Sequence, residues 1–127
     1  MDTPTPRGKV NSFRDLIVWQ KAKRLAADVY RLCLSFPSDR HRGLTEQMLR
    51  SAVSIPSNIA EGYGRNTDKS FSYFLDIARG SLFEIETQLV ISNELGFITN
   101  EKIYRELLNQ IEEESKMINA FSKKLKS

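Results

Sequence analysis

Apolar residues recur along the chain at the spacing of an amphipathic helix in four successive segments. The first segment begins at Ser12, with Asp15 over its first turn, and ends at Ser35-Phe36-Pro37. Its apolar positions alternate between spacings of four and three residues: Val18, Ala22, Leu25, Val29, Leu32 and Phe36. The apolar arc is widened by Trp19, Ala26, Tyr30 and Cys33. This pattern predicts a helix that touches more than one neighbour.

A second helix is expected from Gly43-Leu44 to Gly62-Tyr63-Gly64. Its predicted core positions are Leu44, Met48, Ala52, Ile55 and Ile59. Pro56 removes one backbone donor and crowds the carbonyl of Ala52. Because the apolar periodicity continues beyond it, we expect a kink at Pro56 and not the end of the helix.

Two further helices follow after short breaks. The third is capped by Thr67 or Asp68, ends before Gly96, and buries Phe71, Phe74, Leu75, Ala78, Leu82, Ile85 and Leu89. The fourth is capped by Thr99 or Asn100, and its stripe is Ile103, Leu107, Ile111, Ile118, Phe121 and Leu125. It closes on Lys123, Lys124 and Lys126, which suit the negative end of a helix dipole.

The predicted fold is therefore all-α, an antiparallel up-down four-helix bundle over residues 12–127. Residues 1–11 are expected to form a disordered N-terminal arm. A chain of 127 residues with 40% apolar and 28% charged residues suits one globular domain. It lacks an apolar run of the roughly 18 residues that a membrane crossing needs. With one cysteine, it is expected in a reducing cytoplasm.

The chain offers little for catalysis. Its one histidine, His41, falls in a loop, and its one cysteine, Cys33, falls on an apolar helix face and is expected to act as a small core residue. Helical dinuclear metal sites need paired ligands three or four residues apart, and no two carboxylates have that spacing here. Gly62-Tyr63-Gly64 is interpreted as a helix end, because it lacks the context of a phosphate loop. We expect no catalytic residue, no metal and no cofactor.

A polar stripe runs along the second helix through Arg50, Ser54, Asn58 and Glu61. It could be a solvent face, a buried or interfacial hydrogen-bond network, or a ligand contact. The small serine and asparagine side chains favour close approach of another backbone.

Glu114 stands where the fourth apolar stripe should continue, between Ile111 and Ile118. A buried carboxylate needs a partner, and Arg50 is the predicted one. The alternative is a local twist that places the run of three glutamates from Glu112 to Glu114 in water.

Phe83 and Val90 lie seven residues apart on the side of the third helix opposite its core stripe. A monomer would expose both. Together with the broad apolar arc that contains Trp19, they predict an interface between copies of the chain.

Basic residues favour the first half of the chain: residues 1–65 carry 11 Lys and Arg against 6 Asp and Glu. Lys21, Arg24 and Arg31 share one flank of the first helix. This flank could be an ordinary solvated face. In a ring-shaped oligomer, the same flank would repeat in each subunit and could bind phosphates.

The sequence resembles the family of small four-helix-bundle proteins named for reading frames in 23S ribosomal RNA intervening sequences. The resemblance covers Phe13 to Phe121 and rests on FRDLIVWQKA from Phe13, Phe36-Pro37, LTEQ from Leu44, SAVSIPSNIAEGYGR from Ser51, IARGSL from Ile77 and EIETQL from Glu84. It implies a homo-oligomeric bundle, a pentameric ring. More distantly, the chain is similar to accessory proteins of diversity-generating retroelements, which are pentameric bundles that bind nucleic acid and a reverse transcriptase.

The family signature falls on Trp19, Gln47, Arg50, Ser54, Pro56, Asn58, Glu61, Gly62, Arg65, Gly80, Ser81 and Glu84. One departure is Leu49-Arg50, where two adjacent basic residues are expected. We therefore expect a structural polar network of Arg50, Ser54, Asn58, Glu61, Glu84 and Glu114. Anion contacts are expected at Lys21, Arg24, Arg31, Arg50 and Arg65, and the oligomer interface at Trp19, Phe83 and Val90.

The predicted function is that of a non-enzymatic, homo-oligomeric scaffold associated with RNA or a nucleoprotein. The alternative is a protein-interaction adaptor that touches no nucleic acid. Salt dependence separates the two, because phosphate contacts weaken steeply with ionic strength.

Overall fold

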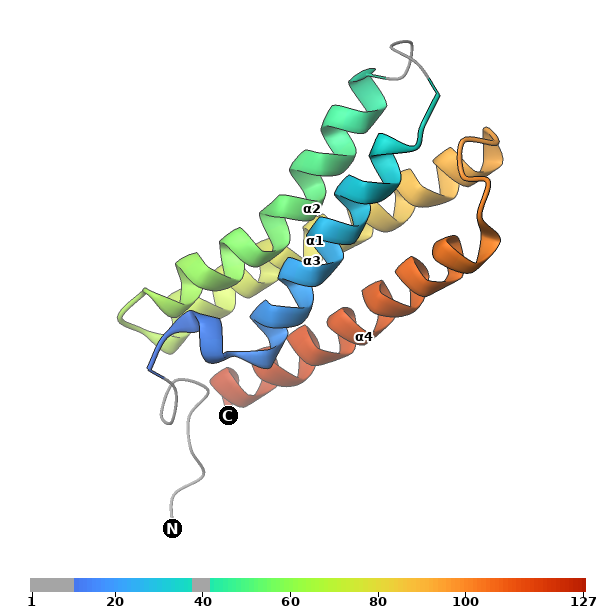
Figure 1. Ribbon diagram of the computed structural model, residues 1–127. Helices are drawn as coiled ribbons and strands as arrows, with labels where there is room; N and C mark the ends of the chain where they lie inside the picture. Colours follow the sequence, from blue (N-terminus) through green and yellow to red (C-terminus); the bar gives the residue numbers. More distant parts are fainter. Residues whose placement is uncertain (1–10, 38–41) are drawn as a thin grey trace.

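Four helices pack side by side in the computed structural model, which describes residues 11–37 and 42–127 (Figure 1). A short 3-10 turn, η1 (Phe13–Asp15), precedes α1 (Ile17–Leu34), α2 (Arg42–Tyr63), α3 (Asp68–Glu94) and α4 (Glu101–Lys126). Over these two described stretches there is no strand, and the all-α prediction is confirmed. The predicted N-terminal arm, apart from Asn11, lies outside the described residues.

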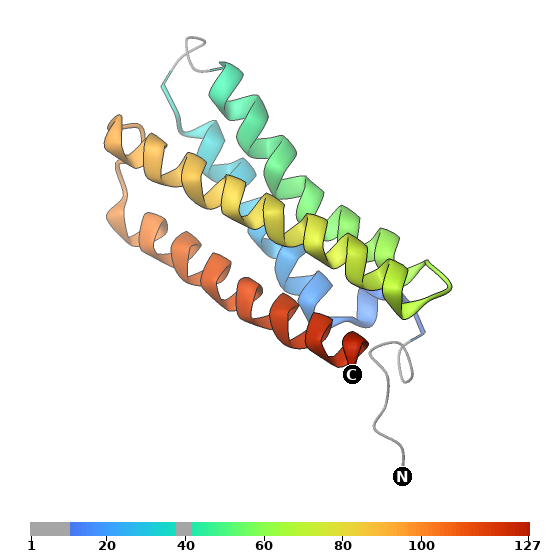
Figure 2. The same ribbon diagram turned by 180° about the vertical axis from the view of Figure 1, so that it is seen from behind.

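Each helix contacts two of the other three. The pairs in contact are α1–α2, α2–α3, α3–α4 and α1–α4, so α1 and α3 form one diagonal of the bundle and α2 and α4 the other. Figure 2, which shows the molecule from behind, accordingly brings α3 to the front and places α1 at the back. Among the described residues, no helix is long and apolar enough to cross a membrane.

The predicted apolar stripes meet between the helices. Leu25 of α1, Ile55 of α2, Leu82 of α3 and Ile118 of α4 are all at most 1% exposed. Tyr30 and Ile103 differ from the prediction, because they are 53% and 39% exposed and lie at the margins of their stripes. The core is therefore the one that the periodicity indicates, with a narrower arc on α1.

The start of α1 also differs from the prediction. Ser12 does cap a helical turn, since its Oγ accepts a hydrogen bond from the Arg14 N–H at 3.2 Å, but that turn is η1. Leu16 adopts extended backbone angles and separates η1 from α1. Leu16 is 5% exposed, so this break places an extra apolar side chain in the core.

The other helix ends follow the sequence closely. α2 continues through Pro56 to Tyr63. Thr67 caps α3 by accepting a hydrogen bond from the Ser70 N–H, and Asn100 caps α4 by accepting one from the Ile103 N–H, both at 3.1 Å. Gly96 follows α3 with a φ of +79°, the left-handed conformation that glycine adopts without steric cost.

The backbones of α2 and α3 come very close at Gly62. A Cβ atom on Gly62 would lie 2.7 Å from Cδ1 of Phe71 and 3.2 Å from its carbonyl oxygen. Phe71 is fully buried. Only a residue without a side chain therefore fits at this crossing.

We predict that Gly62→Ala lowers the free energy of unfolding by about 1–3 kcal/mol, because the added methyl group must displace Phe71. Gly43→Ala is the matched control on the same helix, since nothing lies within 4 Å of a Cβ there. Its effect should stay within about 0.5 kcal/mol. Urea unfolding of the two variants measures the difference, and equal stabilities would contradict the close approach.

Candidate functional site

One side of α3 carries large apolar side chains that no helix of the described chain covers. Phe83 and Val90, both predicted to be exposed, are 56% and 47% exposed. Three more residues share this side of the helix: Tyr73, Ile77 and Ile91. We call these five residues the outer face of α3. Because the core stripe lies on the opposite side, α3 is apolar on two faces. The role of Phe83 and Val90 in an interface stays a prediction.

Gly80 lies in the middle of this outer face. A Cβ at Gly80 would have nothing within 4 Å, in contrast to Gly62. A glycine inside a helix costs roughly 1 kcal/mol relative to alanine. Packing within the described chain gives no reason for that cost, and the glycine leaves a flat place where another backbone could approach.

Trp19, the third predicted interface residue, is engaged within its own chain. Its ring makes an edge contact with Phe13 at a centroid distance of 5.1 Å, and the Lys23 ammonium lies 5.3 Å from the ring centroid. Trp19 is half-buried. It therefore offers less free apolar surface than Phe83, and its place in an interface stays a prediction.

Part of the predicted polar network forms a cluster between α2 and α3. The Ser81 hydroxyl donates to Ser54 Oγ at 2.8 Å. Asn58 Nδ2 donates to Ser54 Oγ at 2.9 Å and to the Ser54 carbonyl at 2.8 Å. Ser81 is 5% exposed, and Ser54 and Asn58 are half-buried. Three small polar side chains thus satisfy one another where the two helices meet.

The remaining members of the predicted network do not join this cluster. Arg50, Glu61 and Glu84 are exposed. Glu61 pairs with Arg65 at 2.8 Å, and the Arg65 guanidinium lies 4.8 Å from the centroid of the Phe74 ring. The polar stripe is therefore divided: its inner edge forms a network, and its outer edge faces solvent.

Glu114 is buried, as its place in the apolar stripe indicates. It is 1% exposed, and neither carboxyl oxygen accepts a hydrogen bond within the described chain. Burial, the largest cause, and the neighbouring Glu113 carboxylate raise the pKa of Glu114, Lys21 opposes them, and the net result is a pKa of about 8. At neutral pH the group is therefore mostly protonated, which avoids an isolated buried charge.

Arg50 is not the partner of Glu114, and this prediction is wrong. α2 and α4 lie on a diagonal of the bundle, so a side chain on the exposed face of α2 cannot reach the buried face of α4. The nearby cation, Lys21, pairs with Glu113 at 3.0 Å. The alternative of a twist that exposes all three glutamates is also wrong, since only Glu112 and Glu113 are exposed.

The cations predicted on α1 differ in their surroundings. Lys21 pairs with Glu113, and Arg31 pairs with Asp28 at 2.8 Å. Asp28 also accepts a hydrogen bond from Gln110 of α4 at 3.0 Å. Arg24 is exposed and makes no ion pair in the described chain. Glu113 of α4 and Asp28 of α1 thus partly neutralise the basic flank of α1.

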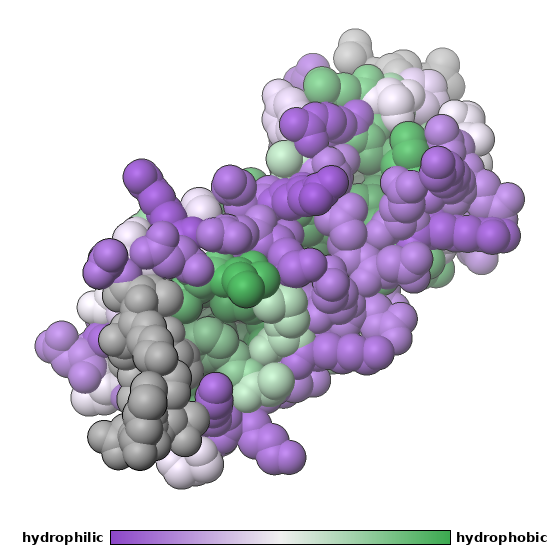
Figure 3. Space-filling model, turned by 60° about the horizontal axis from the view of Figure 1, so that its bottom comes forward, coloured by the Kyte–Doolittle hydropathy of each residue, from purple (hydrophilic) through white to green (hydrophobic). Residues whose placement is uncertain are grey.

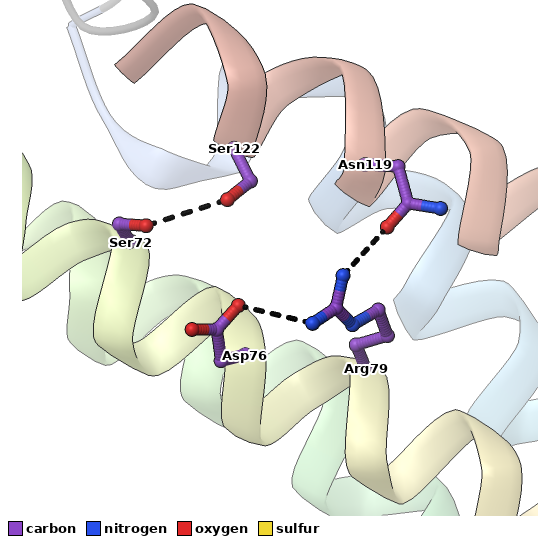
Figure 4. Close-up of polar contacts among 5 residues, drawn as sticks. All are labelled: Ser72, Asp76, Arg79, Asn119 and Ser122. Carbon is purple, nitrogen blue, oxygen red and sulfur yellow. Dashed lines mark hydrogen bonds and ion pairs between the residues drawn. The ribbon is translucent and has the colours of Figure 1, made fainter. Parts of the chain in front are cut away.

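A further polar contact, between α3 and α4, was not predicted from the sequence. Arg79 donates to Asn119 Oδ1 at 3.1 Å and lies 3.5 Å from Asp76, while Ser72 and Ser122 hydroxyls meet at 3.3 Å (Figure 4). Ser72 and Ser122 are buried. The three-residue spacing of Asp76 and Arg79 was the available signal for the first pair.

Residues 11–37 and 42–127 offer few side chains that could bind a metal ion or act as a nucleophile. No cluster of three or more His, Cys, Asp or Glu residues there could hold a metal ion. Cys33 is buried, and burial raises the pKa of its thiol to about 11, so it behaves as a core residue. His41 lies outside the described residues.

We predict that the stability of the fold decreases from about pH 4.5 to about pH 8 because of Glu114. Over this range the unfolded state loses the proton while the folded state keeps it. Ionisation of the unfolded chain therefore costs up to about 5 kcal/mol of stability by pH 8, and the loss then levels off.

Glu114→Gln should remove this part of the pH dependence, because the amide does not ionise. Glu112→Gln is the control, since Glu112 is exposed, pairs with Lys116 at the surface and is not among the groups that shift the pKa of Glu114. Urea unfolding at pH 5 and pH 8.5 measures the two slopes. Wild type and Glu114→Gln with the same slope would show that Glu114 titrates normally.

The chain matches a known protein family over most of its length. A family described as 23S rRNA-intervening sequence protein matches residues 14–120. The comparison with curated proteins finds no match for the chain.

Proposed function

The chain belongs to the family of 23S rRNA-intervening sequence proteins, and from this premise we propose that it is a non-enzymatic, homo-oligomeric helical-bundle protein that serves as a scaffold. The observation that carries the proposal is the outer face of α3, where Phe83, Tyr73 and their neighbours are exposed. Apolar patches of this kind mark interaction sites in soluble proteins. We place the protein in the cytoplasm, because a single cysteine suits a reducing compartment.

The residues that the family resemblance singles out support a structural role. Ser54, Asn58 and Ser81 bond to one another, and Gly62 allows α2 to approach α3. These residues hold helices together and form no constellation of nucleophile, base and oxyanion donors. Their geometry therefore favours a scaffold over an enzyme.

We further propose that the bundle is antiparallel and up-down, with a kink at Pro56. The contacts support the first part: Ser92 lies against Met48, and Ser81 lies against Ser54, so residue numbers fall along α3 as they rise along α2. Lys21 against Glu113 and Gln110 against Asp28 give the same order for α1 and α4. The kink rests on the backbone donor that proline lacks.

Association of copies should depend on the outer face of α3. We predict that light scattering at tens of micromolar protein gives the wild type a mass greater than that of a monomer. Phe83→Gln with Val90→Gln should weaken association at least about 10-fold, because it removes two apolar contacts. The stoichiometry that the family resemblance implies is a pentamer.

Val53→Gln is the control for this experiment, because Val53 is 54% exposed on α2, away from the outer face. Its particle size should match that of the wild type. A wild type that stays monomeric would refute the scaffold proposal.

A second candidate function is association with RNA, as the similarity to nucleic-acid-binding accessory proteins suggests. The observation that favours it is that Arg24 and Arg50 are exposed and have no acidic partner within the described chain. Repeated around a ring, such cations could contact several phosphates together. The alternative is an adaptor that binds only proteins.

We predict that replacing both arginines by alanine weakens binding to a ribosomal RNA fragment about 10-fold or more. The slope of log affinity against log salt should fall by about one for each lost phosphate contact, which is up to about 2 for each copy that touches the RNA. Lys69→Ala with Lys102→Ala removes the same charge from other exposed positions and should have a smaller effect. Gel shifts at two salt concentrations measure this, and oligomers that bind no RNA at low salt would favour the adaptor.

A further inference from the structure

An apolar groove lies between the beginning of α1 and the end of α4. Its volume is about 780 Å³, and its walls include Ile17, Val18, Met117 and Phe121. Ile17 is 59% exposed and shares this groove with other apolar side chains. Figure 3 shows hydrophobic surface gathered at this end of the bundle, bordered by hydrophilic residues.

The surroundings of this groove are basic. Lys123 and Lys124 line it on the α4 side, with Asp15 on the other side. Ile17 also borders a second hollow, along the outside of α1, which contains Lys21, Lys23, Arg24 and Arg31 against a single carboxylate, Asp28. Counted over both hollows, six cations face two carboxylates. We call the two hollows together the α1–α4 face.

The outer face of α3 has the opposite character. In the first half of this helix Asp76 pairs with Arg79, and from Gly80 to Glu94 the chain contains three carboxylates, Glu84, Glu86 and Glu94, and no lysine or arginine. All three are exposed, and they flank the exposed Phe83, Val90 and Ile91. This is an acidic amphipathic helix with an apolar ridge, the kind of element that fits a basic apolar groove.

We infer that copies associate head to tail, with the outer face of α3 of one copy packed against the α1–α4 face of the next. This inference rests on the proposed homo-oligomer and specifies its contact surface. The two faces complement each other in charge and are both apolar at their centres, around Phe83 and Ile17. A second copy of the chain is therefore the partner that the surfaces themselves select.

The positions of the two faces suit such an arrangement. α1 and α3 lie on a diagonal of the bundle, so the faces point in different directions and one copy can use both at once. A contact between two different faces is heterologous, and it closes into a ring when the rotation between copies permits. A contact of α3 with α3 would instead bring six carboxylates together and stop at a dimer.

Mixing variants tests the head-to-tail contact. Ile17→Glu blocks only the α1–α4 face, and Phe83→Gln with Val90→Gln blocks only the outer face of α3. All three positions are exposed. Circular dichroism checks that each variant folds. Each variant alone should lose association at least 10-fold. A 1:1 mixture should form a dimer and no larger particle in light scattering, because just one intact pair of faces remains.

The possible outcomes separate the two proposals. If the wild type is oligomeric and Ile17→Glu associates as well as wild type, α3 meets another surface and the head-to-tail contact is wrong, while the scaffold proposal stands. If the wild type is monomeric, both fail. Val53→Gln is the control and should leave particle size unchanged.

A charge exchange provides a second test that leaves the apolar residues in place. Lys123→Glu with Lys124→Glu should weaken association at least 10-fold, and so should Glu86→Lys with Glu94→Lys. Both sets are exposed, and circular dichroism checks the fold of each, because Lys123 and Lys124 also stabilise the C-terminal end of α4. Combining the two sets in one chain should restore association, since the charges again oppose. Failure of the combined variant to associate better than either set alone would overturn the proposed contact.

Discussion

Burial of apolar surface on α3 is the constraint on which the rest of this structure depends. The inner face of α3 fills the core between α2 and α4, with Leu75, Leu82 and Leu89 fully buried. The outer face carries Phe83 and four other large apolar residues for which the bundle has no fifth helix. Each square ångström of such surface removed from water contributes about 25 cal/mol, so a partner surface that covers several of these side chains stabilises the complex by several kcal/mol before the cost of association.

Some polar side chains inside the bundle have hydrogen-bond partners within the described chain, and Glu114 does not. Ser54, Asn58 and Ser81 satisfy one another, so they allow α2 and α3 to approach closely beside Gly62 without leaving an orphan group. Glu114 finds no partner and instead keeps its proton. The first arrangement fixes the pairing of two helices. The second arrangement leaves the buried carboxyl group of Glu114 unable to ionise without a loss of stability. Glu114 lies beside Glu113, which pairs with Lys21 at the surface where α1 packs against α4.

The sequence correctly predicted features that depend on the position of a residue around its own helix. It did not predict the side-chain contacts that depend on which helices are neighbours. Periodicity located the core stripes and the exposed Phe83 and Val90, because each follows from the angle of a residue around its own helix. It also placed Glu114 in an apolar stripe, but a local twist that exposes this glutamate stayed open as an alternative. The pairing of Glu114 with Arg50 failed because it requires α2 and α4 to be neighbours, and they are diagonal. Similarly, the ion pair of Lys21 with Glu113 joins residues that are far apart in the sequence. The break at Leu16 was not predicted either; its backbone is extended and its side chain is buried among residues of the bundle core.

The position of the cations links assembly to any contact with RNA. Arg24 lies on the α1–α4 face, so a neighbouring copy seated there would place the carboxylates of its α3 beside this guanidinium and cover it. Arg50 is exposed on α2 and lines neither hollow of the α1–α4 face, so a copy seated on that face would leave it uncovered. Phosphate contacts in the assembled state would therefore depend on α2, while contacts through Arg24 would compete with association. Since the outside of α1 is also neutralised in part by Asp28 and Glu113, the basic flank of α1 is better suited to an acidic helix, which brings apolar contacts as well as charge, than to a phosphate backbone.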